Sequence, residues 1–137
     1  MKSEILLVDD DRIFNLLHSR FFEKAGVSRS LLNSFKSGEE CLSYLDGHQE
    51  TNKTVFLVFL DISMPGMDGW DFLEVLQDRH YRDNTMVVML SSSVDGADKK
   101  RAQHYEQVMY YLEKPLSPHF IKILKEQESF EGLFRNG

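Results

Sequence analysis

Residues 55–61 read VFLVFLD, an uninterrupted apolar run followed by an acidic residue. A run of this kind, without alternating polar positions, is typical of a strand that is buried on both faces, and such strands form parallel sheets covered by helices. Residues 5–8, 86–90 and 108–112 have the same character, and another candidate strand lies near residues 31–35. These runs supply the strands of a buried sheet.

Helical patterns lie between the runs. Four of these segments have residues at helical spacing: Ile13, Leu16, Leu17 and Phe21; Cys41, Leu42 and Leu45; Trp70, Leu73, Leu76 and Gln77; and Phe120, Ile121 and Leu124. A fifth helix is expected over the largely polar segment 97–107. Strands that alternate with helices form right-handed βαβ units. The sequence therefore predicts an α/β fold, with a doubly wound, five-stranded parallel sheet and helices on both faces.

Length and composition narrow the class of protein. A chain of 137 residues is expected to form one domain, and its formal charge of −6 argues against non-specific nucleic-acid binding, which requires positive charge. Its single cysteine, Cys41, excludes an internal disulfide and fits a reducing compartment. No apolar run has the length of a signal-peptide core or a membrane span. We therefore expect a cytoplasmic protein without membrane insertion.

Acidic residues follow two of the predicted strands. Asp9, Asp10 and Asp11 come directly after residues 5–8, and Asp61 comes directly after residues 55–60. Because the carboxyl ends of parallel strands share one edge of the sheet, these carboxylates are expected to converge there. Clustered carboxylates repel one another unless a cation joins them, and an all-oxygen set suits Mg²⁺. The alternative for any single aspartate is that it caps the following helix.

Polar residues also follow the two later strands. Ser91, Ser92 and Ser93 come after residues 86–90, and Lys114 comes shortly after residues 108–112. A hydroxyl and an ammonium group facing an acidic metal site would suit a phosphoryl group. The turn at 62–69 (ISMPGMDG) is expected to bring the backbone carbonyl of Ser63 over the same edge as a further oxygen ligand.

In order along the chain, these motifs resemble the receiver domain of response regulators, the phospho-acceptor module of two-component signalling, and in particular the single-domain chemotaxis regulators. The matching motifs are Val8-Asp9-Asp10, residues 60–69, Ser91-Ser92 and Lys114-Pro115. The resemblance covers residues 5 to about 125. It implies a flavodoxin-like fold, a receiver domain over 1–125 and a C-terminal helical extension or tail over 126–137, with no output domain.

The resemblance also implies a role for each matching residue. Asp61 would be the phospho-acceptor, and Lys114 would neutralise the phosphoryl oxygens. Mg²⁺ would be held by Asp9, Asp10, Asp61 and the Ser63 carbonyl. The Ser91 hydroxyl and the Ser92 amide would bind the new phosphoryl group, and Tyr111, or Tyr110 if the register differs by one, would turn inward on activation. Asp11, a third acid beyond the matching pair, is interpreted as a helix cap or a first-turn acid and not as a metal ligand.

The same resemblance implies the partners of a stand-alone response regulator. A histidine kinase or a histidine phosphotransfer protein would supply the phosphoryl group, and the switched state would bind a downstream protein effector or pass the group along a relay. Such a protein promotes its own phosphorylation and dephosphorylation and is not an enzyme that acts on a separate substrate.

Two other functions stay open at this stage. Asp9-x-Asp11 also resembles the nucleophile motif of haloacid-dehalogenase-type phosphatases, with Asp9 as the nucleophile, but Ile13 stands where that family has a hydroxyl residue. A receiver fold that is never phosphorylated and serves only as a binding module is the other alternative.

The histidines and the apolar residues near the C-terminus are given structural interpretations. The five histidines lack the spacing of metal ligands and are predicted to lie on the surface. Phe130, Leu133 and Phe134 share one helical face near the C-terminus. This face is interpreted as a lengthened last helix that packs on its own domain, with a homodimer or partner contact as the alternative.

Overall fold

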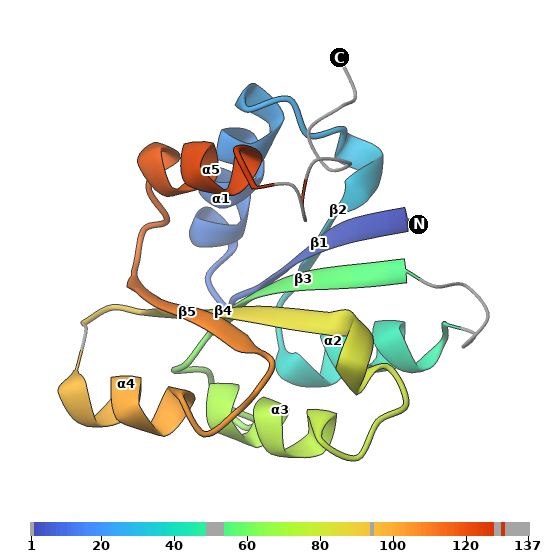
Figure 1. The fold of residues 1–137 in the computed structure, drawn as a ribbon, viewed down its shortest axis with the longest axis vertical. Coiled ribbons are helices and arrows are strands. Elements are labelled where there is room, and N and C mark those ends of the chain that lie inside the picture. The colour runs from blue at the N-terminus through green and yellow to red at the C-terminus, as the bar shows by residue number, and fades with distance from the viewer. Residues whose placement is uncertain (1, 49–53, 94, 128–129, 131–137) are drawn as a thin grey trace.

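The computed structural model describes residues 2–48, 54–93, 95–127 and 130. Within them the strands form one parallel sheet in the order β2-β1-β3-β4-β5 (Figure 1). The strands are β1 (Lys2–Val8), β2 (Leu32–Phe35), β3 (Thr54–Asp61), β4 (Thr85–Ser91) and β5 (Val108–Glu113), and the helices are α1 (Arg12–Lys24), α2 (Gly38–Asp46), α3 (Gly69–Leu76), α4 (Gly96–Ala102) and α5 (Pro118–Lys125). The predicted doubly wound parallel sheet is confirmed. No helix in these ranges has both the length and the apolarity needed to cross a bilayer.

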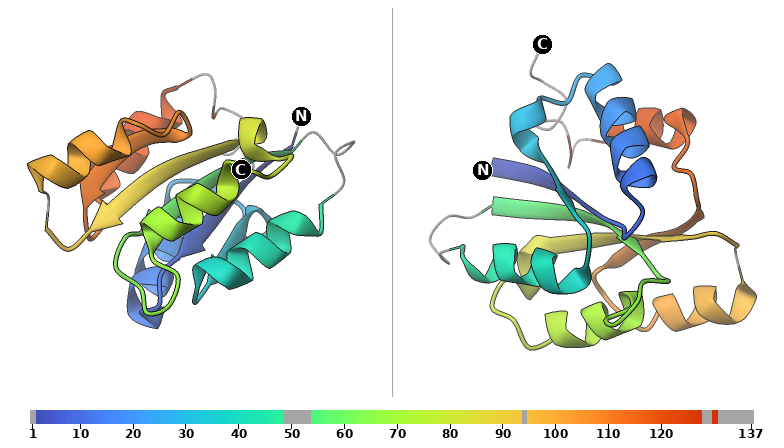
Figure 2. Two further views of the ribbon diagram at one scale, coloured as in Figure 1. Left: turned by 90° about the horizontal axis from the view of Figure 1, so that it is seen from below. Right: turned by 180° about the vertical axis from the view of Figure 1, so that it is seen from behind.

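Helices cover both faces of the sheet, α1 and α5 on one and α2, α3 and α4 on the other (Figures 1 and 2). Strand β3 divides its side chains between the two layers: Val58 and Leu60 pack on the α2–α4 side, and Leu57 and Phe59 pack on the α1–α5 side. All four are at most 1% exposed. The continuous apolar run of β3 therefore fills two cores at once, because successive side chains of a strand point to opposite faces.

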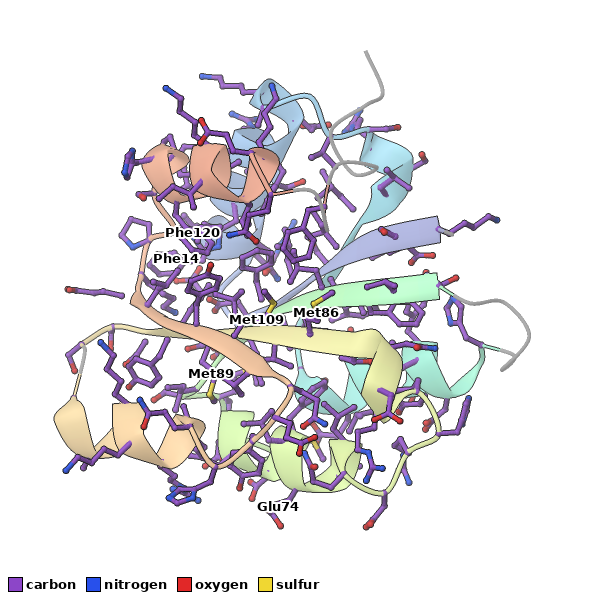
Figure 3. The ribbon with its side chains drawn as sticks, viewed as in Figure 1. Phe14, Glu74, Met86, Met89, Met109 and Phe120 are labelled. Carbon is purple, nitrogen blue, oxygen red and sulfur yellow. The ribbon has the colours of Figure 1, made fainter. Side chains whose placement is uncertain are left out.

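Strand β4 follows the same rule. Met89 points into the α3–α4 layer, whereas Met86 packs on the α1–α5 side (Figure 3). Its neighbour β5 is less buried, and Met109 is 37% exposed. The central strands thus carry most of the apolar burial that stabilises the fold.

The register of the strands brings their carboxyl ends together. Val8 pairs with Leu60, and Asp61 pairs with Leu90. Ser91 pairs with Glu113, the residue before Lys114. The polar residues that follow β1, β3, β4 and β5 therefore share one edge of the sheet, as the strand pattern predicts.

Helix α1 packs through a face that includes Phe21 and Phe22 but leaves out two of the predicted apolar residues, Ile13 and Leu16. Its buried residues are Asn15, His18 and Phe22, while Ile13 is 73% exposed and Leu16 is 55% exposed. The prediction that all five histidines lie on the surface was wrong for His18, which is 2% exposed. Polar Asn15 and His18 can be buried because both hydrogen-bond to backbone groups of neighbouring loops.

Helix α4 is shorter than the helical segment predicted over 97–107. It ends at Ala102, and Gln107, the residue before β5, is 7% exposed. The Gln107 carbonyl accepts a hydrogen bond from Val87 N, and its side chain accepts one from Gln77 Nε2. These contacts fix Gln107 in the connection from α4 to β5, and local periodicity does not reveal them.

The predicted C-terminal face lies only partly within the described residues. Helix α5 ends at Lys125, and Phe130 is 1% exposed in the core between α1, α5 and the sheet. Leu133 and Phe134 lie outside the described residues. Phe130 therefore contributes to the core of its own domain.

Candidate functional site

Three carboxylates converge where β1 and β3 end. Asp9, Asp10 and Asp61 each offer an oxygen atom, and these atoms lie within 4.8 Å of one another. Asp9 and Asp61 are both 3% exposed, whereas Asp10 faces solvent. The cluster therefore combines two buried acids with one accessible acid at its rim, which is a suitable oxygen donor set for a hard divalent cation.

Lys114 joins the two buried acids from the end of β5. Its Nζ lies 3.0 Å from Asp9 Oδ2 and 3.5 Å from Asp61 Oδ1. The Lys114 side chain is only 9% exposed, and its backbone N–H donates to the carbonyl of Ser91 across 2.7 Å. A single ammonium group cannot balance three carboxylates, so the cluster keeps an excess of negative charge.

The loop after β1 is held by its own side chains. Asp9 Oδ1 accepts a hydrogen bond from the Asp11 N–H at 2.9 Å, and Asn15 Nδ2 donates to the Asp9 carbonyl at 3.0 Å. Asp11 is the N-cap of α1 and accepts from the Ile13 N–H. Asp11 thus caps the helix, as interpreted from the sequence, and Asp9 is free to direct its second oxygen at Lys114.

A tight turn after β3 returns the chain over Asp61. The Gly69 N–H donates to the Ile62 carbonyl at 2.8 Å, and a Cβ on Gly69 would lie 2.9 Å from Ile62 Cα. Gly66 adopts a φ of +78°, which side chains disfavour. Inside this turn the Ser63 N–H donates to Asp61 Oδ1 across 3.3 Å. The turn therefore depends on glycine at both positions.

The hydroxyl and aromatic residues lie at neighbouring positions on β4 and β5. The Ser91 hydroxyl donates to the Ser93 carbonyl at 2.6 Å, and Ser92 faces solvent. Tyr111 is 8% exposed in the layer with α4, whereas Tyr110 points to the opposite face, where its ring packs on Phe120. Of the two tyrosines, Tyr111 is therefore the one on the α4 side of the sheet.

Comparison with known proteins places this geometry in a family. Residues 5–124 match the response regulator receiver domain. The chain belongs to the response regulator receiver family. It is 32% identical over 114 residues to the probable methanogenesis regulatory protein FilR2 of Methanothrix harundinacea, covering 82% of this chain and 72% of that protein.

Other matches agree with this assignment. The heme response regulator HssR of Staphylococcus epidermidis is 33% identical over 71% of this chain, which spans only 38% of HssR. The crystal structure of a two-component response regulator from Cytophaga hutchinsonii matches with a TM-score of 0.73 and 28% identity, over 92% of this chain and all of that one. The shared part is thus the receiver domain.

The ionisable groups of the site shift one another's pKa. Burial, followed by repulsion from Asp9, raises the pKa of Asp61 to about 6, against the opposing attraction of Lys114. Burial alone would lower the pKa of Lys114, but the hydrogen bond to Asp9 and the charge of Asp61 outweigh it and raise the pKa. Lys114 therefore stays charged, while Asp61 is ionised at neutral pH at a cost in stability.

We expect Asp61→Asn to stabilise the receiver domain near pH 7 in EDTA. The pKa of Asp61 is about 6 in the folded chain and ordinarily 3.8. Because the folded chain binds this proton more tightly than the unfolded chain does, the protonated Asp61 stabilises the fold fully below about pH 4, and this stabilisation is lost as the pH rises through 6. Asparagine has no such loss, which predicts a gain of roughly 1–3 kcal/mol at pH 7, since one pKa unit corresponds to about 1.4 kcal/mol.

Urea unfolding of both proteins at pH 4.5 and pH 7 measures this difference. The gain should shrink toward zero at the lower pH. A wild-type chain that is at least as stable as the variant at pH 7 would show that ionised Asp61 carries no cost.

Two residues that sequence reasoning did not select also lie against the site. The ring centroid of Phe14 is 4.2 Å from Lys114 Nζ, and the His18 ring lies one helical turn further along α1. The apolar pattern of α1 does not include them, because it follows Ile13, Leu16, Leu17 and Phe21. The spacing of four residues between Phe14 and His18, directly after the acidic cluster, was the available signal.

Proposed function

We propose that this chain accepts a phosphoryl group on Asp61 from a histidine kinase or a histidine phosphotransfer protein, in a Mg²⁺-dependent reaction. The observation that carries the proposal is the contact of the Lys114 ammonium with both buried carboxylates, Asp9 and Asp61, at one edge of a receiver sheet. Family membership supports a signalling role, since the family is the response regulator receiver domain and HssR, one of the matching relatives, is a response regulator.

The acidic cluster fits a magnesium ion. Its donors are carboxylate oxygens, and the described groups around it leave negative charge in excess. Asp9, Asp10, Asp61 and the backbone carbonyl of Ser63 would hold the ion. When bound, Mg²⁺ would supply positive charge that offsets the charge on the transferring phosphoryl group.

The chemistry assigned to the chain begins at Asp61. One Asp61 carboxylate oxygen forms a bond to phosphorus while the bond from phosphorus to the donor imidazole nitrogen breaks, and the imidazole keeps that electron pair. The transition state is loose, so positioning and charge contribute most of the rate. Lys114 would stabilise the phosphoryl oxygens, and the Ser91 hydroxyl and the Ser92 N–H, at the end of the neighbouring strand β4, would bind the transferred group.

The output is proposed to be a change in protein binding. Ser91 would exchange its hydrogen bond to the Ser93 carbonyl for one to the phosphoryl group. Tyr111, on the neighbouring strand, would then turn inward. Together the two side chains would form a two-state element whose equilibrium phosphorylation shifts. In this proposal residues 1–125 act as the receiver unit, and a downstream protein effector or a relay partner recognises the altered face.

The first test is the intact mass of the chain after incubation with acetyl phosphate. The proposal expects the gain of one phosphoryl group in Mg²⁺ and little or none in EDTA. Incubation with a purified phosphohistidine protein should give the same product. If neither donor modifies the chain in Mg²⁺, the alternative of a receiver fold that serves only as a binding module replaces the proposal.

Lys114→Ala is expected to slow phosphorylation by roughly 10–100-fold, because a hydrogen bond to a charged group contributes about 1.5–3 kcal/mol. The rate is followed by intact mass at fixed acetyl phosphate and Mg²⁺. Lys122→Ala, which removes an exposed lysine of α5, is the matched control and should leave the rate unchanged. Equal rates for both variants would show that Lys114 does not contribute to the reaction.

A further inference from the structure

Helix α1 supports the segment that carries Lys114 through two side chains one turn apart. Phe14 places its ring under the ammonium, with 4.2 Å between Nζ and the ring centroid. The centroid of the His18 ring lies 5.9 Å from that of the Phe14 ring, and His18 is 2% exposed. Figure 3 shows Phe14 beside the connection from β5 to α5. An aromatic face attracts a cation, so this contact adds to the two carboxylate contacts in fixing the ammonium.

His18 binds the backbone of the same segment. Its Nε2 accepts a hydrogen bond from the Leu116 N–H at 2.9 Å, and both residues are at most 2% exposed. An accepting Nε2 requires the neutral ring with its proton on Nδ1. Burial lowers the pKa of His18 to about 4 against the opposing charge of Asp9, with Lys114 adding to the lowering, which agrees with a neutral ring.

The segment from Lys114 to Leu116 is thus tied at both ends to different parts of the fold. The Lys114 N–H donates to the Ser91 carbonyl on β4, and the Leu116 N–H donates to His18 on α1. Only Pro115, which has no N–H, lies between the two ties. The position of the Lys114 backbone, and therefore the reach of its side chain, depends on both of them.

We propose that His18 is a positioning residue for Lys114, acting through the Leu116 backbone and through Phe14, and that it sets the rate at which Asp61 accepts a phosphoryl group. This inference rests on the proposed function. Without an acceptor at His18, the buried Leu116 N–H has no partner, and the segment must shift to find one. A displacement of about 1 Å of a charged group at a reacting centre can cost up to about 100-fold in rate.

The test compares His18→Leu, which keeps apolar bulk but removes the acceptor, with His18→Gln, which keeps an acceptor oxygen at a similar reach. Phosphorylation by acetyl phosphate in Mg²⁺ should be roughly 10–100-fold slower in His18→Leu and largely restored in His18→Gln. Leu16→Ala, at an exposed position of the same helix, is the control and should match the wild type.

The same substitutions in a Lys114→Ala background separate positioning from a general structural effect. If His18 acts through Lys114, His18→Leu should change the already reduced rate of Lys114→Ala by less than about twofold. An equal fold-loss in both backgrounds would overturn the inference, as would a wild-type rate in His18→Leu. A wild-type chain that takes up no phosphoryl group would instead defeat the proposed function on which the inference rests.

Circular dichroism shows whether His18→Leu folds. If it does not, Phe14→Leu tests the same support of Lys114 by α1. It removes the ring beneath the ammonium at a half-buried position of α1. Its rate should fall by several-fold, at about the scale of an exposed cation–π contact, and this loss should also vanish in the Lys114→Ala background. A wild-type rate in Phe14→Leu would overturn the proposed support from α1.

Discussion

Asp61→Asn abolishes the uptake of a phosphoryl group from acetyl phosphate, because the amide that replaces the carboxylate is not a nucleophile. The side chain keeps its size, and its oxygen can still accept the hydrogen bond from the Ser63 N–H. It also removes a buried charge whose pKa burial raises to about 6, so the variant is expected to fold at least as well as the wild type. The loss therefore reports chemistry, and intact mass measures it directly.

Asp11→Asn is the matched control for this substitution. Asp11 caps α1 through its Oδ1, a contact that the oxygen of asparagine can keep, and it stands apart from the group of converging acids. We expect it to be phosphorylated like the wild type. Uptake that persists in Asp61→Asn and disappears in Asp9→Asn would contradict the account and favour the phosphatase-like alternative, in which Asp9 is the nucleophile.

Phe59→Ala should destabilise the fold by about 3–5 kcal/mol, the cost of removing a large buried aromatic side chain. Phe59 is 1% exposed on β3, and its ring lies 5.1 Å from that of Phe22 on α1. Its loss opens a cavity between the sheet and the layer of α1 and α5. Because domains are stable by only about 5–15 kcal/mol, this single change removes a large share of the total.

Urea unfolding followed by circular dichroism measures the effect on Phe59. Ile13→Ala is the control: Ile13 is 73% exposed on α1, so its truncation should change stability by less than about 0.5 kcal/mol. A small loss for Phe59→Ala, comparable to that of the control, would mean that this part of the core can collapse around the missing ring.

The sheet could be predicted from the sequence because its signal is local. Continuous apolar runs occur where a strand is covered on both sides, and β3 fills both layers as its pattern requires. The convergence of Asp9, Asp61 and Lys114 followed from topology alone, since parallel strands end at one edge. The turn after Asp61 could likewise be predicted, because Gly66 and Gly69 are typical of a tight turn.

Other features depended on contacts between distant segments. The burial of His18 is explained by Leu116, which is 98 residues away in the sequence, and the early end of α4 by the partners of Gln107 on β4 and near α3. Ile13 and Leu16 fit the apolar pattern of α1 but are exposed, whereas Asn15 and His18 are buried. Apolar periodicity cannot distinguish an exposed apolar strip from a buried face whose polar groups are hydrogen-bonded.

The central claim is that Asp61 is the phospho-acceptor, and the most direct measurement locates the modified residue. After phosphorylation with acetyl phosphate and Mg²⁺, sodium borohydride reduces an aspartyl phosphate to homoserine, and peptide mass spectrometry then identifies the position. The account predicts homoserine at position 61 and unchanged aspartates at positions 9, 10 and 11. Homoserine at position 9, with Asp61 unmodified, would contradict it.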